Sequence, residues 1–170
     1  LAHPLLLASA TIQSEAEFAK LVHLLERFAF RYKNMGGGHA GAASHEYYDA
    51  AIEIRNGTFI LAAFQAKLAA LVNRVAPDAV FREAIKARLD YSSAAQRPNI
   101  KYFLTTLDDY LGSLRTGAQI PTPDRSRLLD LAQVVIEHVY PQTPLAGHED
   151  PQLQPFMDSI QNLSFWAASD

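Results

Sequence analysis

The first half of the chain carries apolar residues at helical spacing, in runs separated by glycine and proline. Ser14 followed by Glu17 forms a capping-box pattern, and apolar positions then recur three and four residues apart until about Lys33. Asn34 and three glycines follow, and glycine destabilises a helix interior. The pattern therefore predicts a first helix from Ser14 to about Lys33 and a loop that runs to Ser44.

The same spacing predicts four more helices. The second runs from Ser44 to the turn pair Asn56-Gly57, and Thr58 is the expected cap of the third. Pro98 suits the first turn of the last helix, whose apolar face ends before Gly112. The third, fourth and fifth helices are predicted over residues 58–76, 78–89 and 98–111.

The composition of the sequence changes near residue 120, where glycine and proline become frequent. The β-branched run 131–136 predicts a strand, residues 151–161 a short helix, and residues 163–166 a second strand. We therefore expect a mainly α protein. Its predicted parts are a helical, bundle-like connecting domain at 1–120 and a small segment at 121–170.

Composition narrows the chemistry. The chain has no cysteine, which excludes disulfides, thiolate zinc sites and cysteine nucleophiles. A net charge of −3 argues against a protein that coats nucleic acid by charge alone. The apolar run 5–10 lacks a preceding basic segment, so we do not favour a signal peptide, and no stretch approaches the roughly 20 apolar residues of a membrane span. The chain does not begin with methionine, and we expect it to be a piece of a longer, cytoplasmic protein.

The residues that suggest chemistry lie in the C-terminal segment. Glu137 and His138 end the first predicted strand, Pro141 follows, and Asn162 opens the second strand. This is the order of a ββα-metal (HNH, or His-Me finger) endonuclease. A neutral imidazole at His138 can accept a proton from water, Glu137 can bind Mg²⁺ or Mn²⁺ through oxygen, and the Asn162 amide can fix the imidazole tautomer.

A structural interpretation competes with this one. A histidine in a strand is more often a structural residue than a base, and a Glu-His pair alone has little specificity. His148-Glu149-Asp150, in the loop between the strands, is best explained as a solvated acidic turn.

Several stretches add a family resemblance. They are Leu25–Tyr32, Ile54–Gly57, Ile100–Leu107, Glu137–Gln142 and Asn162-Leu163. Through them the chain resembles the GmrSD-type (type IV) restriction endonucleases, nucleotide-dependent enzymes that attack modified phage DNA. The resemblance implies a C-terminal HNH domain that cuts DNA, with His138 as catalytic base, Glu137 and His138 at the metal, and Asn162 as the orienter of the histidine.

The resemblance also marks what differs. Nucleotide hydrolysis belongs to an N-terminal domain of the family that this chain lacks. Gln161 stands where the family has glycine, and Trp166 stands among positions that are usually aliphatic. The helix that completes an HNH site would follow Asp170, so we expect the ββα-metal segment to be incomplete and the fragment to be inactive.

A second hypothesis is that the helical region is a protein–protein interaction or oligomerisation module joined to a degenerate nuclease remnant. Its second and third helices have more large apolar residues than one core-facing stripe needs. They are Tyr47, Tyr48, Ile52, Phe59, Ile60, Leu61 and Phe64. These extra apolar residues would be buried in a homo-oligomer or in contacts to the absent N-terminal domain.

Overall fold

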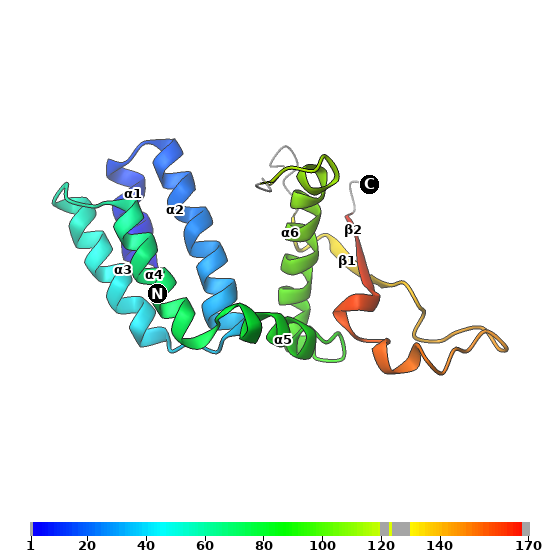
Figure 1. Ribbon diagram of the computed structural model, residues 1–170. Coiled ribbons are helices and arrows are strands. Elements are labelled where there is room, and N and C mark those ends of the chain that lie inside the picture. Colours follow the sequence, from blue (N-terminus) through cyan, green and yellow to red (C-terminus); the bar gives the residue numbers. More distant parts are fainter. Residues whose placement is uncertain (1, 120–122, 124–129, 168–170) are drawn as a thin grey trace. The chain divides into compact units, whose positions relative to one another are not determined.

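The computed structural model describes residues 2–119, 123 and 130–167 (Figure 1). The chain forms two compact units, Leu1–Ala84 and Ile85–Asp170. The protein is mainly helical and has one small antiparallel sheet, which confirms the predicted fold class at that level. The domain boundary near residue 120 stays a prediction. Over the described ranges, no helix has the length and apolar character needed to cross a membrane.

Helices alone build the first unit. They are α1 (His3–Ile12), α2 (Glu15–Phe28), α3 (Ala40–Arg55) and α4 (Leu61–Val75), and α5 (Asp78–Arg88) begins in this unit. Helix α1 packs on α2 and α3, and α4 packs on α2 and α3, so the four helices lie side by side as a bundle (Figure 1). Their shared core includes Leu5, Leu21, Phe28, Tyr47, Phe64 and Leu68.

Helix α2 begins as the sequence predicts and ends differently. Ser14 Oγ accepts from the Glu17 amide and the Glu17 carboxylate accepts from the Ser14 amide, so the capping box is present. The helix then continues as a π-helix, η1 (Ala29–Met35), in which the Gly36 amide bonds to the carbonyl of Arg31 at 2.9 Å. At Gly38 a side chain would collide with the Tyr32 ring, which explains a glycine at that position.

Other boundaries in the first unit correct the predictions. Helix α1, which contains the apolar run 5–10, is not among the predicted helices. Helix α3 starts at Ala40 rather than Ser44, because the His39 side chain caps it by accepting from the Gly41 amide. Thr58 does not cap α4, since its hydroxyl donates back to the Glu53 carbonyl and Ile60 takes the cap position.

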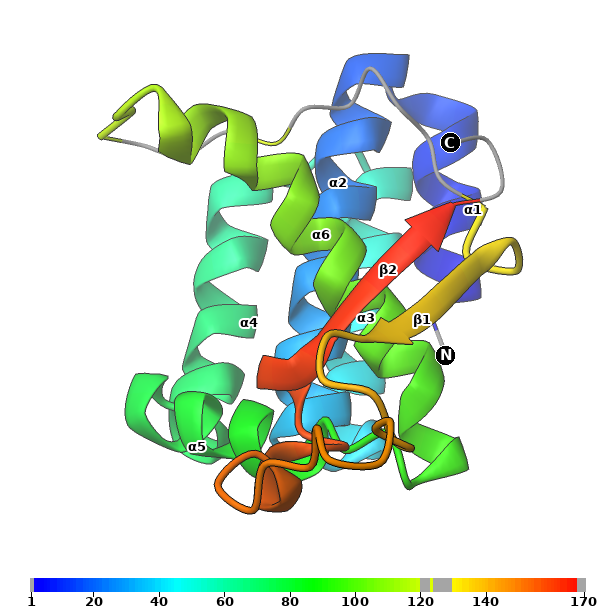
Figure 2. The ribbon, with the colours of Figure 1, turned by 90° about the vertical axis from the view of Figure 1, so that its right-hand side faces the viewer.

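In the second unit a helix packs on a pair of strands. After the end of α5 come η2 (Ala94–Gln96), α6 (Arg97–Arg115), β1 (Val134–His138), η3 (Gln154–Phe156), η4 (Ile160–Asn162) and β2 (Leu163–Ala167). Helix α6 contacts both strands (Figure 2). It runs through Gly112 to Arg115, beyond its predicted end, and two 3₁₀ turns replace the short helix predicted over 151–161.

The strands β1 and β2 pair antiparallel, with His138 opposite Leu163 and Glu137 opposite Ser164. Val134 and Ile136 are buried, whereas Val135 and Glu137 are exposed. This alternation is that of a regular strand, so His138 shares the side of β1 that carries the buried residues. The strand pair thereby fixes the direction in which the candidate base points.

Candidate functional site

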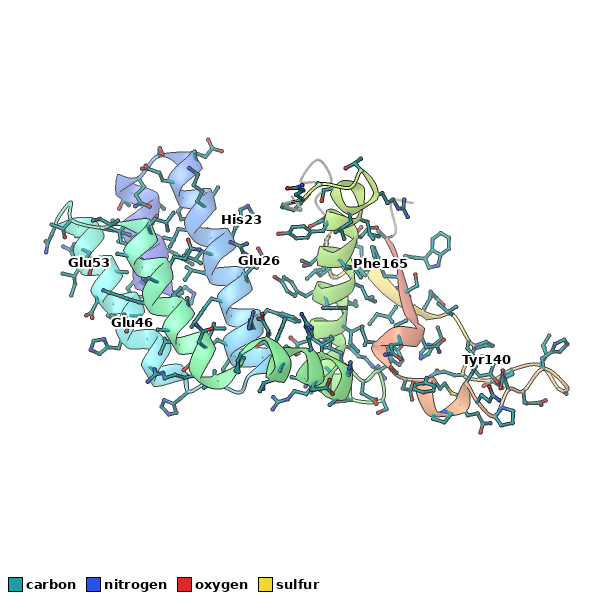
Figure 3. All side chains as sticks on the ribbon, viewed as in Figure 1. His23, Glu26, Glu46, Glu53, Tyr140 and Phe165 are labelled. Carbon is teal, nitrogen blue, oxygen red and sulfur yellow. The ribbon has the colours of Figure 1, made fainter. Side chains whose placement is uncertain are left out.

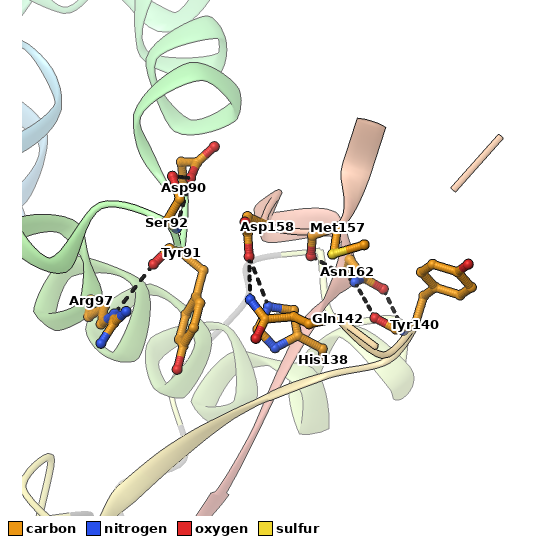
Figure 4. Close-up of polar contacts among 10 residues, drawn as sticks. All are labelled: Asp90, Tyr91, Ser92, Arg97, His138, Tyr140, Gln142, Met157, Asp158 and Asn162. Carbon is orange, nitrogen blue, oxygen red and sulfur yellow. Dashed lines mark hydrogen bonds and ion pairs between the residues drawn. The ribbon is translucent and has the colours of Figure 1, made fainter. Parts of the chain in front are cut away.

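His138, the last residue of β1, is held by polar groups from the segment before β2. Its Nε2 lies 3.2 Å from Asp158 Oδ1, and the same oxygen accepts from Gln142 Nε2 at 2.9 Å (Figure 4). Only about 10 % of the His138 side chain is exposed, so this contact is largely shielded from water. Asp158 therefore fixes the imidazole in a partly desolvated position.

An aromatic residue from a distant part of the sequence packs against the same imidazole. The Tyr91 and His138 rings meet edge to face, with centroids 4.7 Å apart and planes 88° apart. The Arg97 guanidinium lies over the Tyr91 ring, 4.5 Å from its centroid, and Figure 4 shows Tyr91 between Arg97 and His138. Residues 91–97 thus support the candidate site from outside the predicted segment 121–170.

Backbone contacts join these two parts of the second unit. Asp90 forms a β-bridge with Ser159, and the Tyr91 amide donates to the Asp158 carbonyl at 2.8 Å. The backbone of Asp158 is therefore fixed from one side by Tyr91 while its carboxylate reaches His138.

The side-chain amide of Asn162 bonds to backbone groups. Its Oδ1 accepts from the Tyr140 amide at 2.7 Å, and its Nδ2 donates to the carbonyl oxygens of Tyr140 at 2.9 Å and Met157 at 2.8 Å. All three bonds run to the backbone, whereas the carboxylate that meets the imidazole belongs to Asp158. Asn162 therefore shapes the turns on either side of the site, and its role as the orienter of His138 stays a prediction.

The loop between the strands is organised by its own turns. Tyr140 lies near its start (Figure 3), and its hydroxyl accepts from the Asp150 amide at 2.8 Å. Glu149 and Asp150 accept from the nearby amides of Gly147 and Gln152. These short-range bonds agree with an acidic turn for residues 148–150.

The predicted metal ligands do not converge. Glu137 lies on the exposed face of β1, and His138 points to the other face, where Asp158 engages it. Within the ranges that the structure describes, no three His, Asp or Glu side chains gather as a metal-binding group. The described residues therefore do not fit Mg²⁺ or Mn²⁺ held by Glu137 and His138 together.

Sequence reasoning missed Asp158, Tyr91 and a role for Gln142. Gln142 belongs to the stretch that carried the resemblance, but its amide could have bonded to many groups. Asp158 and Tyr91 lie 20 and 47 residues from His138, counted as 158 − 138 and 138 − 91. No periodic signal links such positions, so only the fold brings them together.

Comparison with known proteins adds one finding. Residues 75–170, more than half of the chain, match the family model for the C-terminal domain of GmrSD restriction endonucleases. The matched region includes His138, Asp158 and Tyr91. No curated protein matches the chain.

Proposed function

The chain belongs to the GmrSD restriction endonuclease family, and from this premise we propose that its C-terminal unit cleaves DNA with His138 as the general base. The observation that supports this role best is the contact between His138 and Asp158 at the end of β1. A carboxylate on one ring nitrogen, itself bonded to the Gln142 side-chain amide, is the arrangement that orients a histidine base in hydrolases.

The contact selects the atom that takes the proton. An ionised carboxylate only accepts hydrogen bonds, so Nε2 of a neutral His138 carries the hydrogen and donates it to Asp158 Oδ1. The lone pair then lies on Nδ1, which can remove a proton from water. As the water oxygen bonds to phosphorus, one ester P–O bond breaks and its sugar oxygen leaves. Asp158 stabilises the imidazolium that forms.

We further propose that β1 and β2 are the two strands of an HNH motif, with His138 ending the first and Asn162 preceding the second. Asn162 is then a positioning residue that acts through the backbone of Tyr140. Divalent-metal dependence, with Mg²⁺ or Mn²⁺, is part of the proposal because the family is a nuclease family. No step of the chemistry above is routed through the ion.

The test is DNA nicking by the 170-residue chain, and by longer chains that contain it, on modified and unmodified supercoiled DNA with Mg²⁺, Mn²⁺ or EDTA. His138→Ala is expected to reduce the nicking rate by about 10²- to 10⁴-fold, the usual contribution of a general base. Thermal unfolding of the variant should match that of the parent within a few degrees.

His148→Ala is the matched control, since it removes an exposed histidine from the same unit. It should nick at the parent rate. Undiminished cutting by His138→Ala, or equal loss in both variants, would contradict the base assignment.

A second candidate function is protein–protein interaction by the first unit. Tyr48 and Ile52, one turn apart on α3, and Ile60, just before α4, are each more than half exposed. The surplus of apolar residues seen in the sequence is thus partly on the surface, which suits self-association or a partner. Sedimentation over a wide concentration range, with Ile52→Glu as the disrupting variant, tests it. A monomer at all concentrations would exclude a homo-oligomer.

A further inference from the structure

A cavity of about 520 Å³ opens beside the candidate site, within the second unit. The end of α5 and the segment from η3 to η4 line it. The lining residues that matter are Lys86, Asp90, Gln154, Phe156, Asp158 and Gln161. Asp158 belongs both to this lining and to the contact with His138, so whatever occupies the cavity lies next to the candidate base.

Phe156 gives the cavity an aromatic surface. Its side chain is 50 % exposed although it sits in a tight 3₁₀ turn, where its amide donates to the Leu153 carbonyl at 3.0 Å. A ring held in a fixed turn and left half in water is a ready platform for a planar ligand. Nucleobases stack on such rings with little dependence on their sequence.

The polar groups of the lining favour one kind of planar ligand. Asp158 Oδ1 is occupied by His138 and Gln142, and Asp90 Oδ1 accepts from the Ser92 amide at 2.9 Å. Each carboxylate has a second oxygen that can accept from a ligand. Carboxylates repel phosphate but accept from the exocyclic amino groups of cytosine, adenine and guanine, which thymine lacks. The Gln154 and Gln161 amides can both donate and accept.

Of the basic residues, Lys86 lines the cavity, and the sequence around it is rich in positive charge. The stretch 85–101 contains Lys86, Arg88, Arg97 and Lys101 against one acidic residue, Asp90. Lys86 lines the cavity, so its ammonium group can contact a phosphate of a bound strand. The uncharged base, rather than a phosphate, would then lie next to the carboxylates.

We propose that this cavity binds one unpaired base of the DNA substrate, stacked on Phe156, with a preference for bases that carry an exocyclic amino group. The inference rests on the proposed nuclease function for its choice of nucleic acid. It adds a specificity-determining subsite next to His138, and it requires the DNA to be single-stranded or locally opened there, since a paired base cannot reach a ring face inside a cavity.

Binding can be measured apart from cleavage, by fluorescence anisotropy of short labelled oligo(dC) and oligo(dT) in EDTA. The 170-residue chain should bind oligo(dC) more tightly than oligo(dT). Phe156→Ala should weaken oligo(dC) binding about 5- to 100-fold, the loss expected for one base–aromatic stack. Leu153→Ala is the matched control, because Leu153 is 42 % exposed in the same segment and does not line the cavity.

Two more variants sharpen the test. Phe156→Tyr keeps the ring and should retain the affinity, which separates stacking from a change in the fold. Lys86→Ala should weaken all oligonucleotides alike and lower the slope of log affinity against log salt by about one contact. Unchanged oligo(dC) binding by Phe156→Ala, or no oligonucleotide binding by the parent chain, would overturn the inference.

The result is separable from the fate of the nuclease proposal. His148→Ala, at an exposed histidine that does not line the cavity, should bind oligo(dC) like the parent. A chain that nicks DNA while Phe156→Ala binds normally would remove the subsite and leave the nuclease standing. If the 170-residue chain shows the predicted base preference and loses it in Phe156→Ala, while neither it nor the longer chains nick DNA, the result would support the subsite and count against the nuclease.

Discussion

The two units of this protein are stabilised in different ways. In the first, long-range contacts are mainly apolar, with Leu5, Leu21 and Phe64 fully or almost fully buried among four helices. In the second, polar side chains bond to distant groups, as Asn162 does with Tyr140 and Met157 and Asp158 with His138. The difference follows from the backbone. Helices satisfy their own amides and carbonyls, whereas the turns between β1 and β2 need side chains to do so.

This difference has a functional consequence. A bundle core can exchange one apolar side chain for another of similar size with modest cost, because dispersion and hydration are not directional. Hydrogen bonds to the backbone demand particular atoms at particular distances. The second unit therefore fixes the direction of His138 with groups that tolerate little substitution. The first unit has such long-range bonds at Arg31 but is stabilised mainly by apolar contacts.

The largest loss of stability is expected from a substitution in the apolar core of the first unit. Phe64→Ala removes a side chain that is 1 % exposed and should cost about 3–5 kcal/mol of the free energy of unfolding. Far-UV circular dichroism in urea would measure it. Ile60→Ala, at an exposed position near the start of the same helix, should cost less than about 1 kcal/mol. Equal costs for the two would show that the bundle core is not where the structure places it.

The second largest loss of stability is expected when the hydrogen bonds from Asn162 to the backbone of the second unit are removed. Asn162→Ala removes three hydrogen bonds to the backbone and leaves the Tyr140 and Met157 groups without them, at a cost of about 2–3 kcal/mol. Trp166, the only tryptophan, lies on β2 and reports unfolding of this unit by fluorescence. Gln161→Ala is the control, since its side chain is exposed. If Asn162→Ala unfolds like the parent, backbone bonding by side chains does not hold this unit together.

Much of the fold could be predicted from the sequence, for a physical reason. Helical periodicity and the Ser14 capping box are local patterns, and they predicted five of the six α-helices that lie in the described residues. The exceptions are informative. Helix α1 has apolar residues on most of its surface, so it shows no polar face from which to recognise it. The π-helix at Ala29–Met35 was not predicted either, and its Tyr32 ring packs closely against Gly38.

The site was predictable only in part. The position of His138 at a strand end came from its neighbours in sequence, and β1 indeed ends there. The carboxylate that engages it came from a turn with no periodic pattern, and Tyr91 came from another segment altogether. An amide such as Asn162 can bond to a side chain or to the backbone, and only the geometry of the turns decides which.

A smaller effect, on the nicking rate, is expected from substitutions of Tyr91. They test whether His138 needs the aromatic ring that packs against it. Tyr91→Leu removes an edge-to-face contact that contributes about 0.5–1.5 kcal/mol, so nicking should slow by no more than about tenfold. As a positioning residue, Tyr91 should affect kcat while KM for DNA stays constant. Tyr91→Phe keeps the ring and should restore the rate. A change in KM alone would assign Tyr91 to DNA binding instead.

The smallest effect near neutral pH, and an informative one at high pH, is expected at Tyr47 in the bundle core. Burial, and then the nearby Tyr32, raise the pKa of Tyr47 from 10.0 to about 12. Between these values the unfolded chain has released a proton that the folded chain retains, so rising pH favours unfolding. This contribution to stability is complete below pH 10 and is lost as the pH rises through about 12.

Tyr47→Phe should therefore change stability by less than about 1 kcal/mol at pH 7 and should flatten the decline above pH 10. Tyr48→Phe is the matched control, because Tyr48 is the next residue in the chain and is more than half exposed. The stability of this variant should decline with pH as that of the parent does. Urea unfolding of the three chains at pH 8, 10 and 11 would measure the difference. If all three lose stability in parallel, the Tyr47 hydroxyl reaches water, and the core of the first unit is less dry than its packing indicates.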